Sequence, residues 1–122
     1  MGRQVFRVPP QALPTIVEAL SRKGVTWKWH SGGRDGGGIT REYCPVCDPL
    51  ILSNAIITGP LRRHLQDHET LFRDIDNSDD MPEVAFVIPP NSESGHPAPS
   101  TVSRYEQFVR RLVGKVQGNR IL

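Results

Sequence analysis

Four residues between positions 44 and 68 have the types and the spacing of a metal site. Cys44 and Cys47 are the two cysteines of the 122-residue chain, and two residues separate them. This spacing lets one tight turn present both thiolates to the same ion. His64 and His68 are four residues apart, which places them on the same face of a helix. The pattern predicts a tetrahedral Zn2+ site with Cys44, Cys47, His64 and His68 as ligands.

A closed set of four ligands favours a structural role for the zinc, because no coordination position is left for water or substrate. Sixteen residues separate Cys47 from His64, slightly more than zinc fingers usually have. The alternatives are a redox-active C-x-x-C pair and two core histidines with unrelated thiols. Pro49 and the apolar run after it do not match the strand-turn-helix context of the redox chemistry. His30 and His96 are not near a recognisable nucleophile or acid pair. We therefore expect no enzymatic activity.

The histidine-bearing segment does not fit a DNA-reading helix. The positions that contact bases in related fingers correspond to Ile57, Pro60 and Arg63, and of these only the arginine could donate to a base edge. A single finger also buries too little surface for specific binding. Sequence-specific DNA recognition is therefore not expected.

Aromatic and basic residues on two segments are candidates for binding RNA or a protein. Trp27 and Trp29 alternate with polar residues, so a strand would carry both on one face, where they could stack on bases. The alternative, that both tryptophans belong to the core, stays open. A basic side of the C-terminal helix could meet a partner. The six candidate binding residues are Trp27, Lys28, Trp29, Arg34, Arg110 and Arg111.

The hydrophobic periodicity predicts a small α+β domain with short antiparallel strands, a zinc-ligating helix and a C-terminal amphipathic helix. The predicted strands are 3–8, 24–30, 39–43 and 83–88, and the predicted helices are 13–20, 60–75 and 103–116. Eleven Gly and eleven Pro indicate many loops. Residues 1–90 are expected to form the zinc-stabilised domain, 91–102 a flexible linker, and 103–122 the last helix.

The C-terminal helix has a wide apolar face that cannot remain in water. Ser103 and Glu106 are placed to form a capping box at its start. The face can pack on its own domain or pair with a second copy of the chain, so a homo-oligomer is one of two open readings.

The net charge of +2 conceals basic ends and an acidic middle. Residues 1–43 and 101–122 each carry a net +4, whereas 44–100 carry −6. The ends could meet phosphate, or the segments could neutralise one another in the fold; both readings stay open. No apolar run approaches the length of a membrane span, and the start of the chain lacks the apolar core of a signal peptide. We expect an intracellular, soluble protein with no membrane partner.

A short stretch resembles a known family. "LSRKGVTWKWHS", residues 20–31, is followed by the cysteine pair and resembles the N-terminal part of the P1 proteins of sobemoviruses. The residues that carry the resemblance are Thr26, Trp27, Trp29, His30, Ser31, Cys44 and Cys47. It implies a non-enzymatic viral suppressor of host RNA silencing that also supports virus movement. The implied partner is RNA or a host silencing-machinery protein, in the host cytoplasm or additionally the nucleus.

A function of another class remains open beside the viral one. A cellular Cys2His2 zinc-finger adaptor that binds proteins would also be a small, zinc-stabilised binding module. Suppression of RNA silencing in leaf tissue would distinguish the viral protein from the adaptor.

Overall fold

A computed structural model describes residues 9–35 and 38–119 of the chain, and the predicted strand 3–8 lies outside them. The helices and strands are, in chain order, α1 (Ile16–Arg22), β1 (Trp27–Ser31), β2 (Arg34–Asp35), β3 (Gly38–Ile39), α2 (Asn54–Thr58), β4 (Leu65–Gln66), α3 (His68–Asp76), β5 (Val84–Ile88) and α4 (Val102–Gly118). Short 3-10 segments are η1 (Pro45–Cys47), η2 (Pro49–Leu52), η3 (Pro60–His64), η4 (Ser78–Asp80) and η5 (Asn91–Glu93). The predicted α+β class is confirmed at this level.

The main sheet has three strands in the order β4-β1-β5, and both pairings are parallel. Trp29 of β1 pairs with Leu65 on one side and with Phe86 on the other. The prediction of antiparallel strands is therefore wrong for this sheet and holds only for the small β2-β3 pair. Side-chain alternation reveals which residues share a face but not strand direction, and the long connections between these strands permit parallel crossovers.

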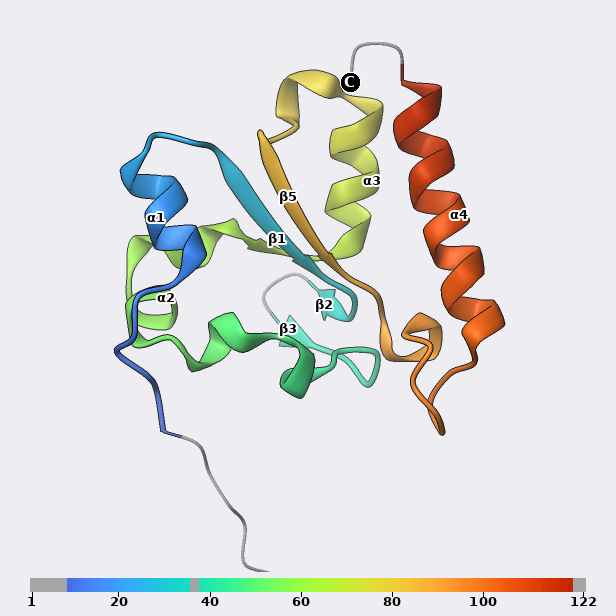
Figure 1. Ribbon diagram of the computed structural model, residues 1–122, viewed down its shortest axis with the longest axis horizontal. Helices are drawn as coiled ribbons and strands as arrows, with labels where there is room; N and C mark the ends of the chain where they lie inside the picture. The colour runs from blue at the N-terminus through green and yellow to red at the C-terminus, as the bar shows by residue number, and fades with distance from the viewer. Residues whose placement is uncertain (1–8, 36–37, 120–122) are drawn as a thin grey trace, which may run out of the picture.

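The two faces of β1 are covered by different helices. Trp27 and Trp29 point into a core with Val17 of α1 and Ile56 of α2. Lys28, on the opposite face, pairs with α3. Figure 1 shows α1 and α3 on opposite sides of β1 and β5, with α4 beside α3. The parallel sheet is thus held between two helical layers.

Both tryptophans are core residues. Trp27 is 2% exposed and its indole N–H donates to Ser21 Oγ at 2.8 Å. Trp29 is 8% exposed and stacks on Phe86 with ring centroids 4.9 Å apart. The structure therefore places the two tryptophans in the core and not on a surface that could bind RNA.

The predicted continuous helix 60–75 is wrong. Residues 60–64 form η3, a short extended stretch at β4 follows, and α3 begins afresh at His68. Asp67 interrupts the periodicity because its side chain caps α3, accepting from the backbone N–H of Thr70 at 2.6 Å. His64 and His68 consequently do not share a helix face.

The C-terminal helix α4 packs on its own chain. Phe108 is 2% exposed, Arg111 makes a bidentate ion pair with Glu93, and Lys115 pairs with Asp76 at the end of α3. Its N-cap is Thr101 rather than Ser103. None of the helices in the described part of the chain is long and apolar enough to cross a membrane.

Residues 91–102, predicted as a flexible linker, make specific contacts with the segment before the cysteines. The backbone N–H of Asn91 donates to the Glu42 carbonyl at 2.8 Å, and the N–H of Ser92 donates to the Glu42 carboxylate at 2.9 Å. These bonds bring the end of β5 next to the loop that follows β3. The predicted domain boundaries stay a prediction.

Candidate functional site

The cysteines predicted as metal ligands have another partner. Cys44 and Cys47 form a disulfide with their Cα atoms 5.2 Å apart. The loop that they close is exposed, and Val46 between them is 95% accessible. Tyr43 and Asp48, which flank the loop on either side, are both buried.

The two predicted histidine ligands contact different residues. The His64 ring stacks on Trp27 with centroids 4.4 Å apart, and its Nδ1 lies 2.9 Å from the Trp27 carbonyl oxygen. His68 begins α3, and its Nε2 lies 3.4 Å from Glu69. Within residues 9–35 and 38–119 no group of three or more His, Cys, Asp or Glu side chains is arranged to hold a metal ion. The Cys2His2 finger is therefore not formed in this structure, and zinc binding by the reduced chain stays a prediction.

A pocket lies where the three parallel strands end. Its volume is about 380 Å³. Residues shortly after β1, β4 and β5 line it together with two residues that follow β3: Gly33, Arg34, Thr40, Glu42, Asp67, His68, Glu69, Pro90 and Ser92. In open parallel sheets, ligands bind outside the carboxyl ends of the strands. We therefore take this opening, here called the strand-end pocket, as the candidate site.

Two glycines bring Arg34 to the strand-end pocket. The N–H of Gly32 donates to the Ile88 carbonyl at the end of β5, at 2.9 Å, and a Cβ atom there would collide with the Pro90 backbone. Gly33 has φ +83° and lies against the Tyr43 backbone in the same way. Glycine permits both the left-handed conformation and the close approach. The Gly-Gly pair thus lets the chain turn from β1 into β2 while staying packed on its neighbours.

A buried carboxylate fixes the Arg34 side chain. Asp48 is 0% exposed, and its Oδ2 accepts from Arg34 Nη2 at 2.8 Å, from the Tyr43 hydroxyl at 2.7 Å and from Ser31 Oγ at 3.3 Å. Arg34 Nη2 also donates to the Tyr43 oxygen at 3.2 Å. Burial, and then the bond to Asp48, raises the pKa of Tyr43, so its hydroxyl remains a donor.

Three carboxylates and one imidazole also line the pocket. Glu42 accepts from the backbone N–H of Ser92, and hydrogen bonding by the side chain and backbone of Ser92 holds the pKa of Glu42 below its ordinary value. Asp67 is turned toward the first turn of α3 as its cap. His68 also lines an adjoining pocket of about 390 Å³ with Glu69, Phe72, Arg111 and Lys115. The imidazole therefore lies at the junction of two openings.

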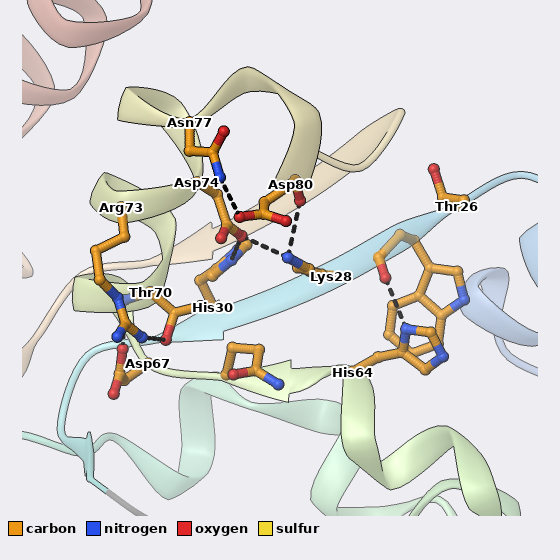
Figure 2. A network of polar contacts seen from close by, with 12 residues as sticks. Thr26, Lys28, His30, His64, Asp67, Thr70, Arg73, Asp74, Asn77 and Asp80 are labelled. Atoms are coloured by element: carbon orange, nitrogen blue, oxygen red, sulfur yellow. Dashed lines mark hydrogen bonds and ion pairs between the residues drawn. The ribbon is translucent and has the colours of Figure 1, made fainter.

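A second polar cluster lies behind α3, away from the pocket. Figure 2 shows Lys28 and His30 of β1 directed toward Asp74 of α3. Lys28 Nζ is 2.6 Å from Asp74 Oδ2 and 2.9 Å from the Asp80 carbonyl, and His30 Nε2 is 3.8 Å from Asp74. His30 is fully buried, and this burial lowers its pKa despite the nearby Phe86 carbonyl and Asp74. None of these residues lines the strand-end pocket, and their contacts hold α3 against β1.

The six residues proposed for partner binding are dispersed. Lys28 is paired in the cluster behind α3, and Arg34 lines the strand-end pocket. Arg110 makes an exposed i,i+4 pair with Glu106, while Arg111 lines the adjoining pocket. With Trp27 and Trp29 in the core, they do not form one surface.

Comparison with known proteins decides the class of this chain. The sequence matches the model of the Phosphoesterase family over residues 3–120. The chain belongs to the Phosphoesterase family. No curated protein matches it.

Membership of the Phosphoesterase family overturns the functional predictions. The resemblance to sobemovirus P1 proteins is wrong, and with it the viral silencing suppressor, RNA-binding and virus-movement roles. The alternative of a zinc-finger adaptor is wrong as well, and so is the expectation that the chain is not an enzyme. The tryptophan-x-tryptophan stretch that suggested the virus family is the core strand β1, in which both tryptophans are buried, and packing alone can produce such a stretch.

Several residues of the strand-end pocket were not among the sequence-based candidates. Glu42, Asp67, Glu69 and Ser92 are far apart in sequence and carry no motif spacing. The available signal was positional, because each follows closely a strand or precedes a helix. It becomes useful only once the strands are known to be parallel.

Proposed function

We propose that this chain takes part in hydrolysing phosphoesters and that the strand-end pocket binds the substrate. The match to the Phosphoesterase family over residues 3–120 is the observation that carries this proposal. The position of the pocket at the carboxyl ends of parallel strands supports it independently.

The chemistry requires groups that hold a negatively charged phosphoryl group and that move protons to or from the reacting oxygens. Arg34 is a cation in the wall of the pocket, and His68 is a side chain of the type that hydrolases most often use for proton transfer. The first turn of α3, which begins at His68, adds the positive end of a helix dipole.

Purified full-length chain should release p-nitrophenol from p-nitrophenyl phosphate or bis(p-nitrophenyl) phosphate. Both substrates are tested with Mg2+, Mn2+, Ca2+ or Zn2+ and without added metal, because many phosphoryl-transfer enzymes recruit such ions. We expect His68→Gln to reduce the rate by about 100-fold, the usual scale for removing a general acid or base. Arg110→Gln, on the exposed face of α4, is the matched control and should retain the wild-type rate.

The proposal fails if correctly folded wild-type chain hydrolyses neither substrate under any of these metal conditions. It also fails if His68→Gln and wild type have the same kcat and KM, since the pocket would then not be the site. Circular dichroism of each variant confirms that the fold is retained.

A further inference from the structure

The guanidinium of Arg34 is held on one side only. A guanidinium has five N–H donors in a planar fork. Among the described residues, its hydrogen bonds to Asp48 and Tyr43 all use Nη2. Nη1 makes no hydrogen bond within residues 9–35 and 38–119, and Arg34 lines the strand-end pocket. Nη1 is therefore left for a ligand, whereas Nε has no hydrogen-bond partner among the described residues but is buried.

The partners of Arg34 make it a rigid group. Asp48 is 0% and Tyr43 is 5% exposed, and the guanidinium carbon lies 5.1 Å from the Tyr43 ring centre. An exposed arginine would lose rotamer freedom on binding an anion. Here the fold has already fixed the side chain, so this entropic cost falls largely on folding rather than on binding.

The charges around the pocket restrict where an anion can lie. Of the described residues that line it, Arg34 carries the one permanent positive charge, whereas Glu42, Asp67 and Glu69 are acidic. Glu42 and Asp67 accept hydrogen bonds from backbone N–H groups, which compensates part of their charge. An oxyanion in this pocket is therefore attracted to Arg34 and repelled by the three carboxylates.

We propose that Arg34 binds the non-bridging phosphate oxygens of the substrate, and that Asp48 and Tyr43 are positioning residues for it. This assignment rests on the proposed phosphoester hydrolysis. Its chemical basis is the match between the planar donor fork of arginine and the oxygens of a phosphoryl group. The ligand class is an oxyanion of tetrahedral phosphorus.

Binding is measured separately from turnover, with inorganic phosphate as the probe in isothermal titration calorimetry and 1H-15N NMR titration. Wild type should bind phosphate, and Arg34→Gln should weaken that binding by at least about tenfold, the scale of losing a charge-assisted pair. Arg34→Lys keeps the charge without the fork and should lie between the two. Arg110→Gln removes an exposed guanidinium from α4 and should bind phosphate as wild type does.

The positioning role is tested with a variant that removes one hydroxyl. Tyr43→Phe should weaken phosphate binding by a few-fold and raise KM with a smaller effect on kcat, because Asp48 still holds Arg34. In Arg34→Ala, added guanidinium ion should restore part of the phosphate binding, which a merely structural arginine would not allow. Asp48→Asn tests the same positioning role, provided that its circular dichroism matches that of wild type.

Equal phosphate affinity in wild type and Arg34→Gln would overturn the assignment, and so would a lack of phosphate binding by folded wild type. Phosphate binding that depends on Arg34 without any phosphoester hydrolysis would support the anion site and refute the proposed function. Hydrolysis with an unchanged KM in Arg34→Gln would refute the role of Arg34 and leave the proposed function standing.

Discussion

The backbone of Gly33 lies against the backbone of Tyr43 so closely that a Cβ atom on Gly33 would overlap the Tyr43 nitrogen. Gly33 also has φ +83°, a conformation that costs other residues on the order of 1–3 kcal/mol. Gly33→Ala should therefore lower the free energy of unfolding by about 2 kcal/mol or more, since the overlap adds to the strain. It should also disturb Arg34, the next residue.

A glycine in open space is the control for this substitution. Nothing lies within 4 Å of a Cβ built on Gly114, in the middle of α4. Gly114→Ala should stabilise the protein by up to about 1 kcal/mol, because alanine is the better helix former. Urea unfolding measures both variants, and a Gly33→Ala protein as stable as wild type would contradict the close approach.

The packing of α4 on its own domain gives a second prediction. Phe108 is 2% exposed and is the buried residue of this helix, so Phe108→Ala should cost about 3–5 kcal/mol. Val102, at the start of α4, is 75% exposed, and Val102→Ala should change stability by less than about 0.5 kcal/mol. Thermal melting of both variants, over a range of protein concentrations, measures these changes in stability. A melting temperature that rises with wild-type concentration would instead indicate that α4 docks on a second copy.

Much of the local structure could be predicted from sequence because it depends on neighbouring residues. The strand at Trp27, the strand at Phe86 and the helix around Phe108 are each indicated by the residue types and spacing of neighbouring positions, and each is present in the structure. The errors arose where one polar side chain outweighed the apolar pattern. The apolar residues of 60–75 follow helical spacing, but the Asp67 side chain caps a new helix, α3, partway along that stretch.

The candidate site could not be derived from sequence in the same way. Arg34, Tyr43 and Asp48 converge because β1 ends beside β5 and the Gly32–Gly33 turn packs on the segment after β3. These are contacts between distant parts of the chain, and the hydrophobic pattern does not encode strand direction or order. The cysteine and histidine spacing was the stronger local signal, but in the structure the two cysteines bond to each other and the two histidines lie on different elements.

The disulfide and the partners of His64 predict how the fold responds to a chelator. A strong chelator such as EDTA should leave the melting temperature and tryptophan fluorescence unchanged, because His64 stacks on Trp27 and the cysteines bond to each other. Reduction should cost no more than about 2 kcal/mol, since the bridge closes a loop of only two intervening residues. A Cys44→Ser, Cys47→Ser double variant is the control for reduction. Cooperative unfolding by chelator alone would show that a metal supports the fold.

The burial of His30 predicts loss of stability in mild acid. The ordinary pKa of histidine is about 6.5 in an unfolded chain, and burial lowers the pKa of His30 in the folded protein. As pH falls below about 6.5, the unfolded chain takes up a proton that the folded chain does not, so protons favour unfolding. The stability that neutral His30 contributes is thus fully present above the unfolded-state pKa. It declines as pH falls from that value toward the lower folded-state pKa. Asp74 and the Phe86 carbonyl oppose this effect, while Lys28 reinforces it.

Urea unfolding at a series of pH values between 7 and 5 measures the His30 contribution. Wild type should lose up to about 1.4 kcal/mol per pH unit more than His30→Gln, the limit for one linked proton. The glutamine variant will be less stable at pH 7, because it replaces a fully buried ring, but its stability should vary less with pH. His96→Gln changes an exposed histidine in the loop before α4 and is the matched histidine-to-glutamine control. If His30→Gln and wild type have parallel stability curves over this range, His30 is not held neutral by its burial against Asp74 and β5.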